Sequence, residues 1–203
     1  MTALVPRRPV CAVCLRPQST CICHWVTPVA HDVEVLILQH PLETGHAKNS
    51  AGLLHLSLPQ SQILIGEAFD AHSLRAALEV PKYTVLLYPQ TATLPQHAVA
   101  PALDPVRLKE PAQLRLVVLD GTWRKSRKML HRSPLLQHLP RLSLEDVPAS
   151  RYAIRKAHKP GQLSTLEATC AALMQLERDP DRFQPLLAAF NGFVAQQLAL
   201  RPQ

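Results

Sequence analysis

Four of the five cysteines lie within 13 residues of one another and are spaced to bind one metal ion. They form the pattern C-x2-C-x6-C-x-C and are Cys11, Cys14, Cys21 and Cys23. Four thiolates at such spacing are typical ligands of a tetrahedral Zn²⁺ ion. Because four sulfurs leave no position for water, we expect a structural zinc ion that supplies folding energy to a small module, residues 1–30.

A second group of reactive side chains follows the apolar run LVVL, residues 116–119. Asp120 ends this run, and Gly121, Thr122 and Trp123 lead into a basic stretch. The first four cations of that stretch are Arg124, Lys125, Arg127 and Lys128. Thr122 is a suitable helix cap, but cations at the positive end of a helix cost about 0.3–1 kcal/mol each. A phosphate over that end reverses the sign, so we predict that this helix binds RNA or DNA.

A third group is Ser-Thr-Leu-Glu, residues 164–167, in front of the apolar run 168–176. By itself this pattern predicts a capping box between Ser164 and Glu167. A basic loop that contains Arg155 and Lys156 precedes it. The loop favours a position at the edge of a cleft, where the helix amides can hold a small carboxylate.

The positive charge is concentrated in one part of the chain. Residues 115–159 contain 11 basic and 3 acidic residues, a net charge of +8, whereas the rest contains 11 basic and 12 acidic residues, a net charge of −1. Charge gathered in this way indicates a polyanionic partner, although a solvated basic face is the simpler alternative.

Apolar runs that alternate with helical patterns must position these groups. We expect strands at residues 33–38, 63–66, 85–88 and 116–119, and an edge strand at 142–144. We expect helices at residues 47–58, 71–79, 165–178 and 182–200, and a basic helix after Trp123 that Pro134 ends. Such alternation predicts an α/β domain, residues 31–203, with a mostly parallel sheet and helices on both faces. Ligands of these sheets bind beyond the carboxyl ends of the strands.

Size and composition exclude several classes of protein. The chain has 203 residues, of which 47% are hydrophobic and 18% charged, so a disordered tail or a disulfide miniprotein is excluded. No apolar run reaches the ~18 residues that span a membrane, and no apolar stretch follows Arg7 and Arg8 as in a signal peptide. We expect a cytoplasmic protein that does not associate with membranes, and the sequence leaves its oligomeric state open.

Five segments, in this order, carry a resemblance to a known family. They are CAVCLRPQSTCIC, LQHPLETGHAKNSAGLL, LLYP, LVVLDGTW and IRKAHKPGQLSTLEA. In this order they resemble the DTW-domain family, whose bacterial members are tRNA-uridine aminocarboxypropyltransferases. That family is related to the SPOUT class of RNA-modifying enzymes, so the resemblance implies a knotted domain.

The resemblance also implies a reaction and its residues. The 3-amino-3-carboxypropyl group of S-adenosylmethionine would pass to N3 of a tRNA uridine, with methylthioadenosine as the by-product. The expected catalytic residues are Asp120, Thr122 and Trp123. The expected donor-binding residues are Tyr88, Pro89, Leu119, Asp120, Gly121, Ser164, Thr165 and Glu167. The expected tRNA-binding residues are Arg124, Lys125, Arg127, Lys128, Arg155 and Lys156.

The chemistry of these side chains leaves several roles open. Asp120 is a candidate base for the N3 proton, or it stabilises the sulfonium or holds the donor's ribose or amino group. Glu167 would take the donor's ammonium, with the amides near Ser164 holding its carboxylate, and Trp123 would stack on uracil or pack beneath the donor. Two other functions also fit: a SPOUT-like RNA methyltransferase, and a non-enzymatic RNA-binding protein with a zinc site.

Overall fold

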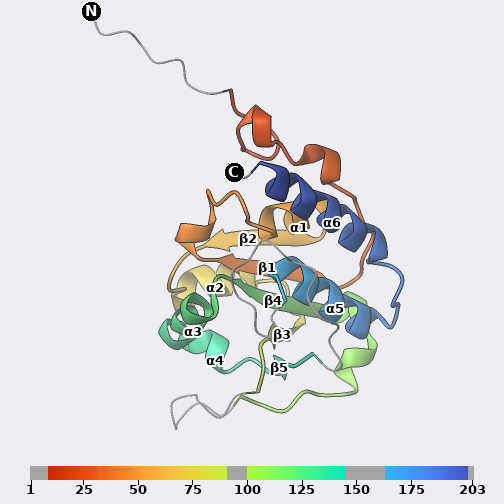
Figure 1. Ribbon diagram of the computed structural model, residues 1–203. Helices are drawn as coiled ribbons and strands as arrows, with labels where there is room; N and C mark the ends of the chain where they lie inside the picture. The colour runs from red at the N-terminus through yellow and green to blue at the C-terminus, as the bar shows by residue number, and fades with distance from the viewer. Residues whose placement is uncertain (1–8, 91–99, 145–162, 201–203) are drawn as a thin grey trace, which may run out of the picture.

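A five-stranded parallel sheet forms the centre of the protein, in a computed structural model that describes residues 9–90, 100–144 and 163–200. The strands are ordered β2-β1-β4-β3-β5, and every neighbouring pair is parallel (Figure 1). Their bounds are Glu34–Gln39 for β1, Ser61–Ile65 for β2, Tyr83–Leu87 for β3, Leu114–Asp120 for β4 and Arg141–Leu142 for β5. The predicted parallel sheet is therefore confirmed.

The two central strands are apolar on both sides. All seven residues of β4 are buried, as are five of the six residues of β1. In β1, Val35 and Ile37 face one core cluster, while Leu36 and Leu38 face the other. This pattern is that of a strand covered on both faces, and it aligns Gln39 with Asp120 at the carboxyl edge of the sheet.

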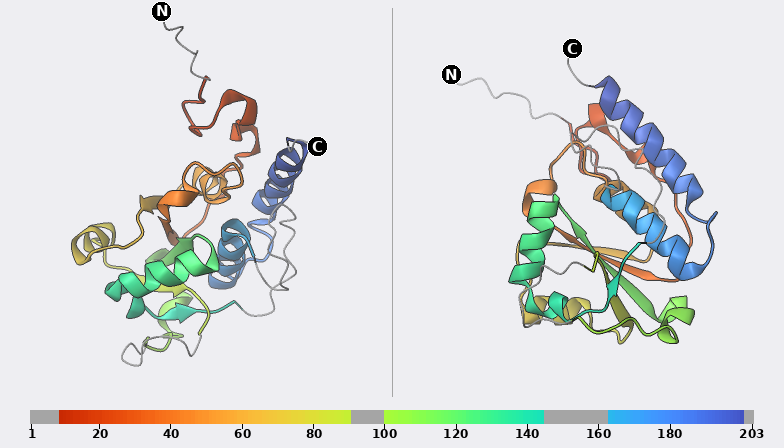
Figure 2. Two further views of the ribbon diagram at one scale, coloured as in Figure 1. Left: turned by 60° about the vertical axis from the view of Figure 1, so that its left-hand side comes forward. Right: turned by 60° about the horizontal axis from the view of Figure 1, so that its bottom comes forward.

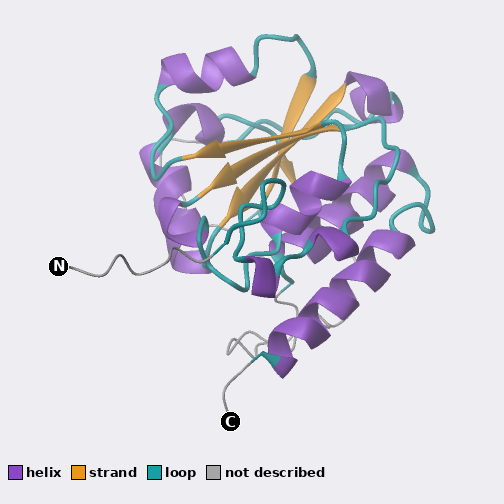
Figure 3. Ribbon diagram, turned by 90° about the horizontal axis from the view of Figure 1, so that it is seen from above, coloured by secondary structure: helices purple, strands orange, loops and turns teal. Residues whose placement is uncertain are grey.

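Helices cover both faces of the sheet, as predicted (Figures 1, 2 and 3). One face carries the helices α1 (Ala51–Ser57), α5 (Thr165–Glu177) and α6 (Gln184–Ala199). The other carries α2 (Ala71–Ala77), α3 (Trp123–Arg132) and α4 (Pro134–Gln137). Within the described residues, no helix is both long and apolar enough to cross a membrane.

Most predicted strands and helices differ from the structure by one or two residues at their ends. Two of the differences have a local cause. The helix expected at 47–58 begins only at Ala51, because the Asn49 side chain accepts a hydrogen bond from the Gly52 amide and ends the preceding turn. The edge strand expected at 142–144 is instead Arg141–Leu142. The chain leaves the sheet at Ser143, whose hydroxyl accepts a hydrogen bond from the Gln90 amide. Pro134 ends the basic helix as expected, and a further short helix, α4, begins at that residue.

Candidate active site and metal centre

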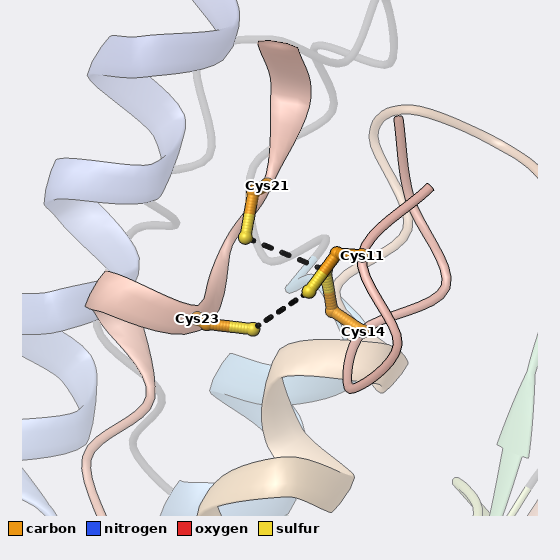
Figure 4. Close-up of side chains that lie close together, drawn as sticks. All are labelled: Cys11, Cys14, Cys21 and Cys23. Atoms are coloured by element: carbon orange, nitrogen blue, oxygen red, sulfur yellow. Dashed lines mark hydrogen bonds between the residues drawn. The ribbon is translucent and has the colours of Figure 1, made fainter. Parts of the chain in front are cut away.

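The four N-terminal cysteines converge on one point, which confirms the predicted cluster (Figure 4). All four sulfur atoms lie within 4.8 Å of one another. The Cys11 and Cys23 sulfurs are 3.6 Å apart, and those of Cys14 and Cys21 are 3.8 Å apart. Sulfurs placed 2.3 Å from a zinc ion at the corners of a tetrahedron are about 3.8 Å apart. The side chains therefore fit a tetrahedral ion, and none of the four cysteines forms a disulfide.

A tight turn prepares one of these thiols for metal binding. The Leu15 amide donates to the Cys11 carbonyl, and Leu15 takes the left-handed conformation with φ of 57°. Backbone hydrogen bonds from Cys14 and Val13 lower the pKa of Cys11 to about 6, whereas burial and the neighbouring thiols raise the pKa of Cys23 to about 12. Because metals bind thiolates, the backbone hydrogen bonds that lower the pKa of Cys11 favour the form of this side chain that binds a metal.

The cysteine segment packs against α6 through a tryptophan. The Trp25 indole N–H donates to Gln196 Oε1 at 2.7 Å, and Gln196 Nε2 donates to the Cys21 carbonyl at 3.3 Å. The indole ring lies directly over Gly192, where a Cβ atom would be 2.1 Å from a ring carbon. A side chain at Gly192 would therefore force Trp25 away from α6.

A cavity of about 270 Å³ opens at the carboxyl edge of the sheet. It is just below the usual size of small-molecule pockets, which is about 300–1,000 Å³. Its lining combines apolar side chains with five hydroxyl groups and contains no charged residue among those described. The lining residues are Leu87, Tyr88, Pro89, Val118, Leu119, Gly121, Trp123, Ser126, Leu142, Ser143, Leu144, Leu163, Ser164, Thr165 and Ala168.

Seven residues singled out from the sequence line this cavity. They are Tyr88, Pro89, Leu119, Gly121, Trp123, Ser164 and Thr165. Three further residues singled out there, Asp120, Thr122 and Glu167, lie beside lining residues in the chain but are not part of the lining. The ends of β3 and β4 and the starts of α3 and α5 thus meet at one place.

The Asp120 carboxylate is held directly behind the cavity wall. It is 5% exposed, Gln39 Nε2 donates to its Oδ2 at 2.9 Å, and Thr165 Oγ1 donates to its Oδ1 at 2.6 Å. These bonds connect β1, β4 and α5 through one carboxylate. Since Thr165 lines the cavity, its hydroxyl group connects the Asp120 carboxylate to that space.

The start of α5 is the predicted capping box. Ser164 Oγ accepts from the Glu167 amide at 3.2 Å, and Glu167 Oε2 accepts from the Ser164 amide at 2.8 Å. Both side chains are buried, which fixes the first turn of the helix. Ser164 and Thr165 are consequently held rigidly against the cavity.

An aromatic pair forms the opposite wall. The rings of Tyr88 and Trp123 meet edge to face with their centroids 5.9 Å apart, and Trp123 is 51% exposed. Burial raises the pKa of Tyr88. A hydrogen bond from Ser126 and the charges of Arg127 and Arg141 counteract part of this rise in pKa. Thr122 caps α3 by accepting from the Lys125 amide, so it positions Trp123 at the cavity mouth.

Part of the positive charge on α3 is neutralised within the protein. Lys125 Nζ lies 2.8 Å from Glu43 Oε1, and Lys128 Nζ lies 2.7 Å from Glu67 Oε1. Arg124 and Arg127 are exposed and have no ion pair with any described residue. The charge pattern of the sequence therefore overstated the free cations of this helix. Arg155 and Lys156 lie outside the described residues.

Two parts of the site were not predicted from the sequence. Gln39 contacts Asp120 because β1 lies beside β4, and residues 142–144 line the cavity because β5 lies beside β3. Both segments end strands, so the rule that parallel sheets bind ligands at their carboxyl edge was the available signal.

The fold and the site define an α/β protein with a cavity at the carboxyl edge of a parallel sheet and a cluster of four cysteines that could hold a metal ion. The model of the DTW domain matches residues 8–198, and the chain belongs to this family. The chain is 32% identical to tRNA-uridine aminocarboxypropyltransferase 2 of Drosophila melanogaster, over 95% of the chain and 76% of the relative.

Other relatives carry similar names. The Mus musculus tRNA-uridine aminocarboxypropyltransferase 2 is 29% identical over 95% of the chain and 64% of its own length. The tRNA-uridine aminocarboxypropyltransferase A of Arabidopsis thaliana is 28% identical over 88% of the chain and 76% of its own length. No solved structure matches the chain.

Proposed function

We propose that this protein transfers the 3-amino-3-carboxypropyl group of S-adenosylmethionine to N3 of a tRNA uridine. One observation carries the proposal: the segments 88–89, 119–123 and 164–167, which contribute to the resemblance to the family, meet at a single cavity. The names of the relatives assign to each of them the transfer of an aminocarboxypropyl group to a tRNA uridine. In this reaction a bond forms between N3 and Cγ of the donor, and the bond between Cγ and sulfur breaks. The sulfur keeps the bonding pair, so methylthioadenosine leaves as a neutral thioether.

The cavity suits the nucleoside part of the donor. Its apolar walls can enclose an adenine, and the hydroxyls of Ser143, Ser164 and Thr165 can bond to polar ring and ribose atoms. The capping box holds Ser164 and Thr165 in place, so Glu167 contributes to donor binding through the helix start that it stabilises. The donor's charged amino acid part would then lie at the cavity mouth, where its Cγ can face the uridine.

Asp120 is the base in this proposal, and Thr165 connects it to the cavity. Uridine N3 must lose its proton to become a good nucleophile. The Thr165 hydroxyl already donates to Asp120 Oδ1, so its oxygen can accept the N3 proton while its own proton passes to the carboxylate. Gln39 holds the other carboxylate oxygen and keeps Oδ1 turned toward Thr165. Trp123, exposed at the mouth, would stack on the uracil.

Several further features belong to this proposal. Arg124 and Arg127, with Arg155 and Lys156, would contact tRNA phosphates, while Lys125 and Lys128 contribute less because of their internal ion pairs. The four-cysteine centre would hold a structural zinc ion in a module of residues 1–30, followed by a catalytic domain of residues 31–203. We further propose that this domain has the SPOUT knot and that the protein acts in the cytoplasm.

Two labels on one donor test the reaction. Purified protein is incubated with tRNA that lacks the modification and with S-adenosylmethionine labelled either at the carboxyl carbon or at the methyl group. We expect carboxyl label in the tRNA, no methyl label there, and release of methylthioadenosine. Methyl label in the tRNA would identify a methyltransferase instead. No transfer, with retained tRNA binding, would identify an RNA-binding protein.

A further inference from the structure

Arg141, on the edge strand β5, is a buried cation without an acidic partner among the described residues. It is 3% exposed, and its Nε and Nη2 atoms are buried with no hydrogen-bond partner in the described parts of the chain. Burial lowers the pKa of Arg141, but a guanidinium stays charged in proteins. A buried charge without a counter-charge is unfavourable. Among the described residues Arg141 has only the ring of Tyr88 beside it, so its Nε and Nη2 groups are available for an anionic ligand.

The other buried arginine of the described residues shows the contrast. Arg115 is 1% exposed near the start of the central strand β4, where its Nε donates to Glu34 Oε1 at 2.6 Å. Its Nη2 donates to Glu34 Oε2 and to the Val80 carbonyl. The fold thus provides one buried arginine with a carboxylate and leaves Arg141 without one from the described residues.

Arg141 lies against the wall of the candidate active site. Its strand neighbour is Leu86, two residues before Tyr88, and its guanidinium carbon is 5.6 Å from the centre of the Tyr88 ring. Tyr88 lines the cavity, and Leu142, the next residue after Arg141, does so as well. Arg127 directly follows the lining residue Ser126 in α3, its charge lowers the pKa of Tyr88, and it has no ion pair with a described residue. Two cations without acidic partners among the described residues therefore flank one wall of the cavity.

We propose that Arg141, together with Arg127, forms an oxyanion site beside Tyr88 that binds a carboxylate or a phosphate group. A guanidinium presents its N–H groups as a planar fork that matches either group. If the proposed function holds, this carboxylate or phosphate group has two sources. One is the donor's carboxylate, and the other is a phosphodiester next to the target uridine. The site itself does not depend on that function.

Inorganic phosphate tests the site without donor or tRNA. The melting temperature of the wild type is measured with increasing phosphate at constant ionic strength, alongside Arg141→Met and Arg127→Gln. A ligand that binds the native state stabilises it, so we expect the phosphate-dependent rise in the wild type to be lost in Arg141→Met and reduced in Arg127→Gln. Arg115→Lys, which keeps the charge next to Glu34, should respond like the wild type. An equal response in all four proteins would overturn the proposal.

Stability without phosphate distinguishes a ligand site from an internal ion pair. Met has a similar length and no charge, so Arg141→Met should be as stable as the wild type or more stable. The opposite result has two parts: Arg141→Met loses much stability, and Arg127→Gln responds to phosphate like the wild type. It would show that the chain itself supplies the partner of Arg141, and it would also overturn the proposal.

Three binding measurements identify the source of the oxyanion. Calorimetry compares S-adenosylmethionine with methylthioadenosine, which has the same nucleoside but no carboxylate. If the donor supplies the group, Arg141→Met raises the Kd of S-adenosylmethionine at least about tenfold and leaves methylthioadenosine unchanged. If tRNA supplies it, both Kd values stay constant, tRNA binds more weakly, and the slope of affinity against salt falls by about one. Unchanged Kd values for all three ligands would refute both sources.

Discussion

The cysteine cluster and the cavity are built in opposite ways. The cluster takes all four sulfurs from residues 11–23, so its ligands are neighbours in the chain. The cavity takes its 15 lining residues from positions 87 to 168, at the ends of three strands and the starts of two helices. In our proposal a metal ion holds the cluster together, whereas the cavity depends on the complete sheet. The two sites share no residue, which makes their separation testable.

The largest effect is expected from Asp120→Asn, which should affect the cavity side alone. Asn can still accept a hydrogen bond from Thr165 but cannot take a proton. We expect the transfer rate to fall at least about 10³-fold while the Kd of S-adenosylmethionine stays within about threefold. Carboxyl-label transfer and calorimetry measure the two quantities. Asp181→Asn, in the exposed turn before α6, is the control. Unchanged turnover in Asp120→Asn would remove this residue from the mechanism.

Cys14→Ser should affect the cluster side alone. Mass spectrometry of the metal content should find one equivalent of zinc per wild-type protein and less than one equivalent in the variant. Without the ion the N-terminal segment loses its main restraint, so the free energy of unfolding should fall by at least about 3 kcal/mol. The Kd of S-adenosylmethionine should change little. Cys170→Ala, in the core of α5, should keep its zinc. Full zinc content in Cys14→Ser would contradict the assignment of four cysteine ligands.

Replacement of Thr165 tests how Asp120 reaches the cavity. Thr165→Val keeps the size of the side chain but removes the hydroxyl, and we expect a loss of about 10- to 100-fold in kcat. Thr165→Ser keeps the hydroxyl and should remain within a few-fold of the wild type. If valine and serine gave equal rates, Asp120 would have to contact the uridine directly.

Substitution of two helical glycines tests how firmly the cysteine segment is attached to the rest of the fold. Gly192→Ala would place a methyl group inside the Trp25 ring, which should cost about 1–3 kcal/mol of unfolding free energy. Gly52→Ala in α1 meets nothing within 4 Å, so its higher helix propensity should stabilise the protein by up to about 1 kcal/mol. Urea unfolding compares the two. Equal effects would mean that Trp25 does not hold the segment on α6.

The smallest effect concerns the charges beside the cavity. Arg124→Gln with Arg127→Gln removes two cations that have no ion pair with a described residue, so the slope of tRNA affinity against salt should fall by about two. Lys125→Gln with Lys128→Gln removes cations already paired with Glu43 and Glu67, and the slope should change by less than about one. The reverse order would show that the internal ion pairs break when tRNA binds.

Much of the local structure was predictable from the sequence. The cysteine spacing, the capping box of α5, the cap of α3 at Thr122 and the four longer strands all depend on residues that are close in the chain. Patterns of this kind predict structure because their hydrogen bonds and their hydrophobic period are local. The helix expected at 47–58 was too long because the side chain of Asn49 competes for a backbone amide.

The sequence by itself thus determined the chemical groups: four thiolates, a carboxylate at a strand end, and a capped helix start. Only the tertiary structure decided which of these groups act together. The strand order β2-β1-β4-β3-β5 places Gln39 beside Asp120 and residues 142–144 against the cavity. It also decides that Arg115 has a carboxylate partner, while Arg141 has none among the described residues. These pairings join segments far apart in the chain, and no local spacing encodes which strands become neighbours.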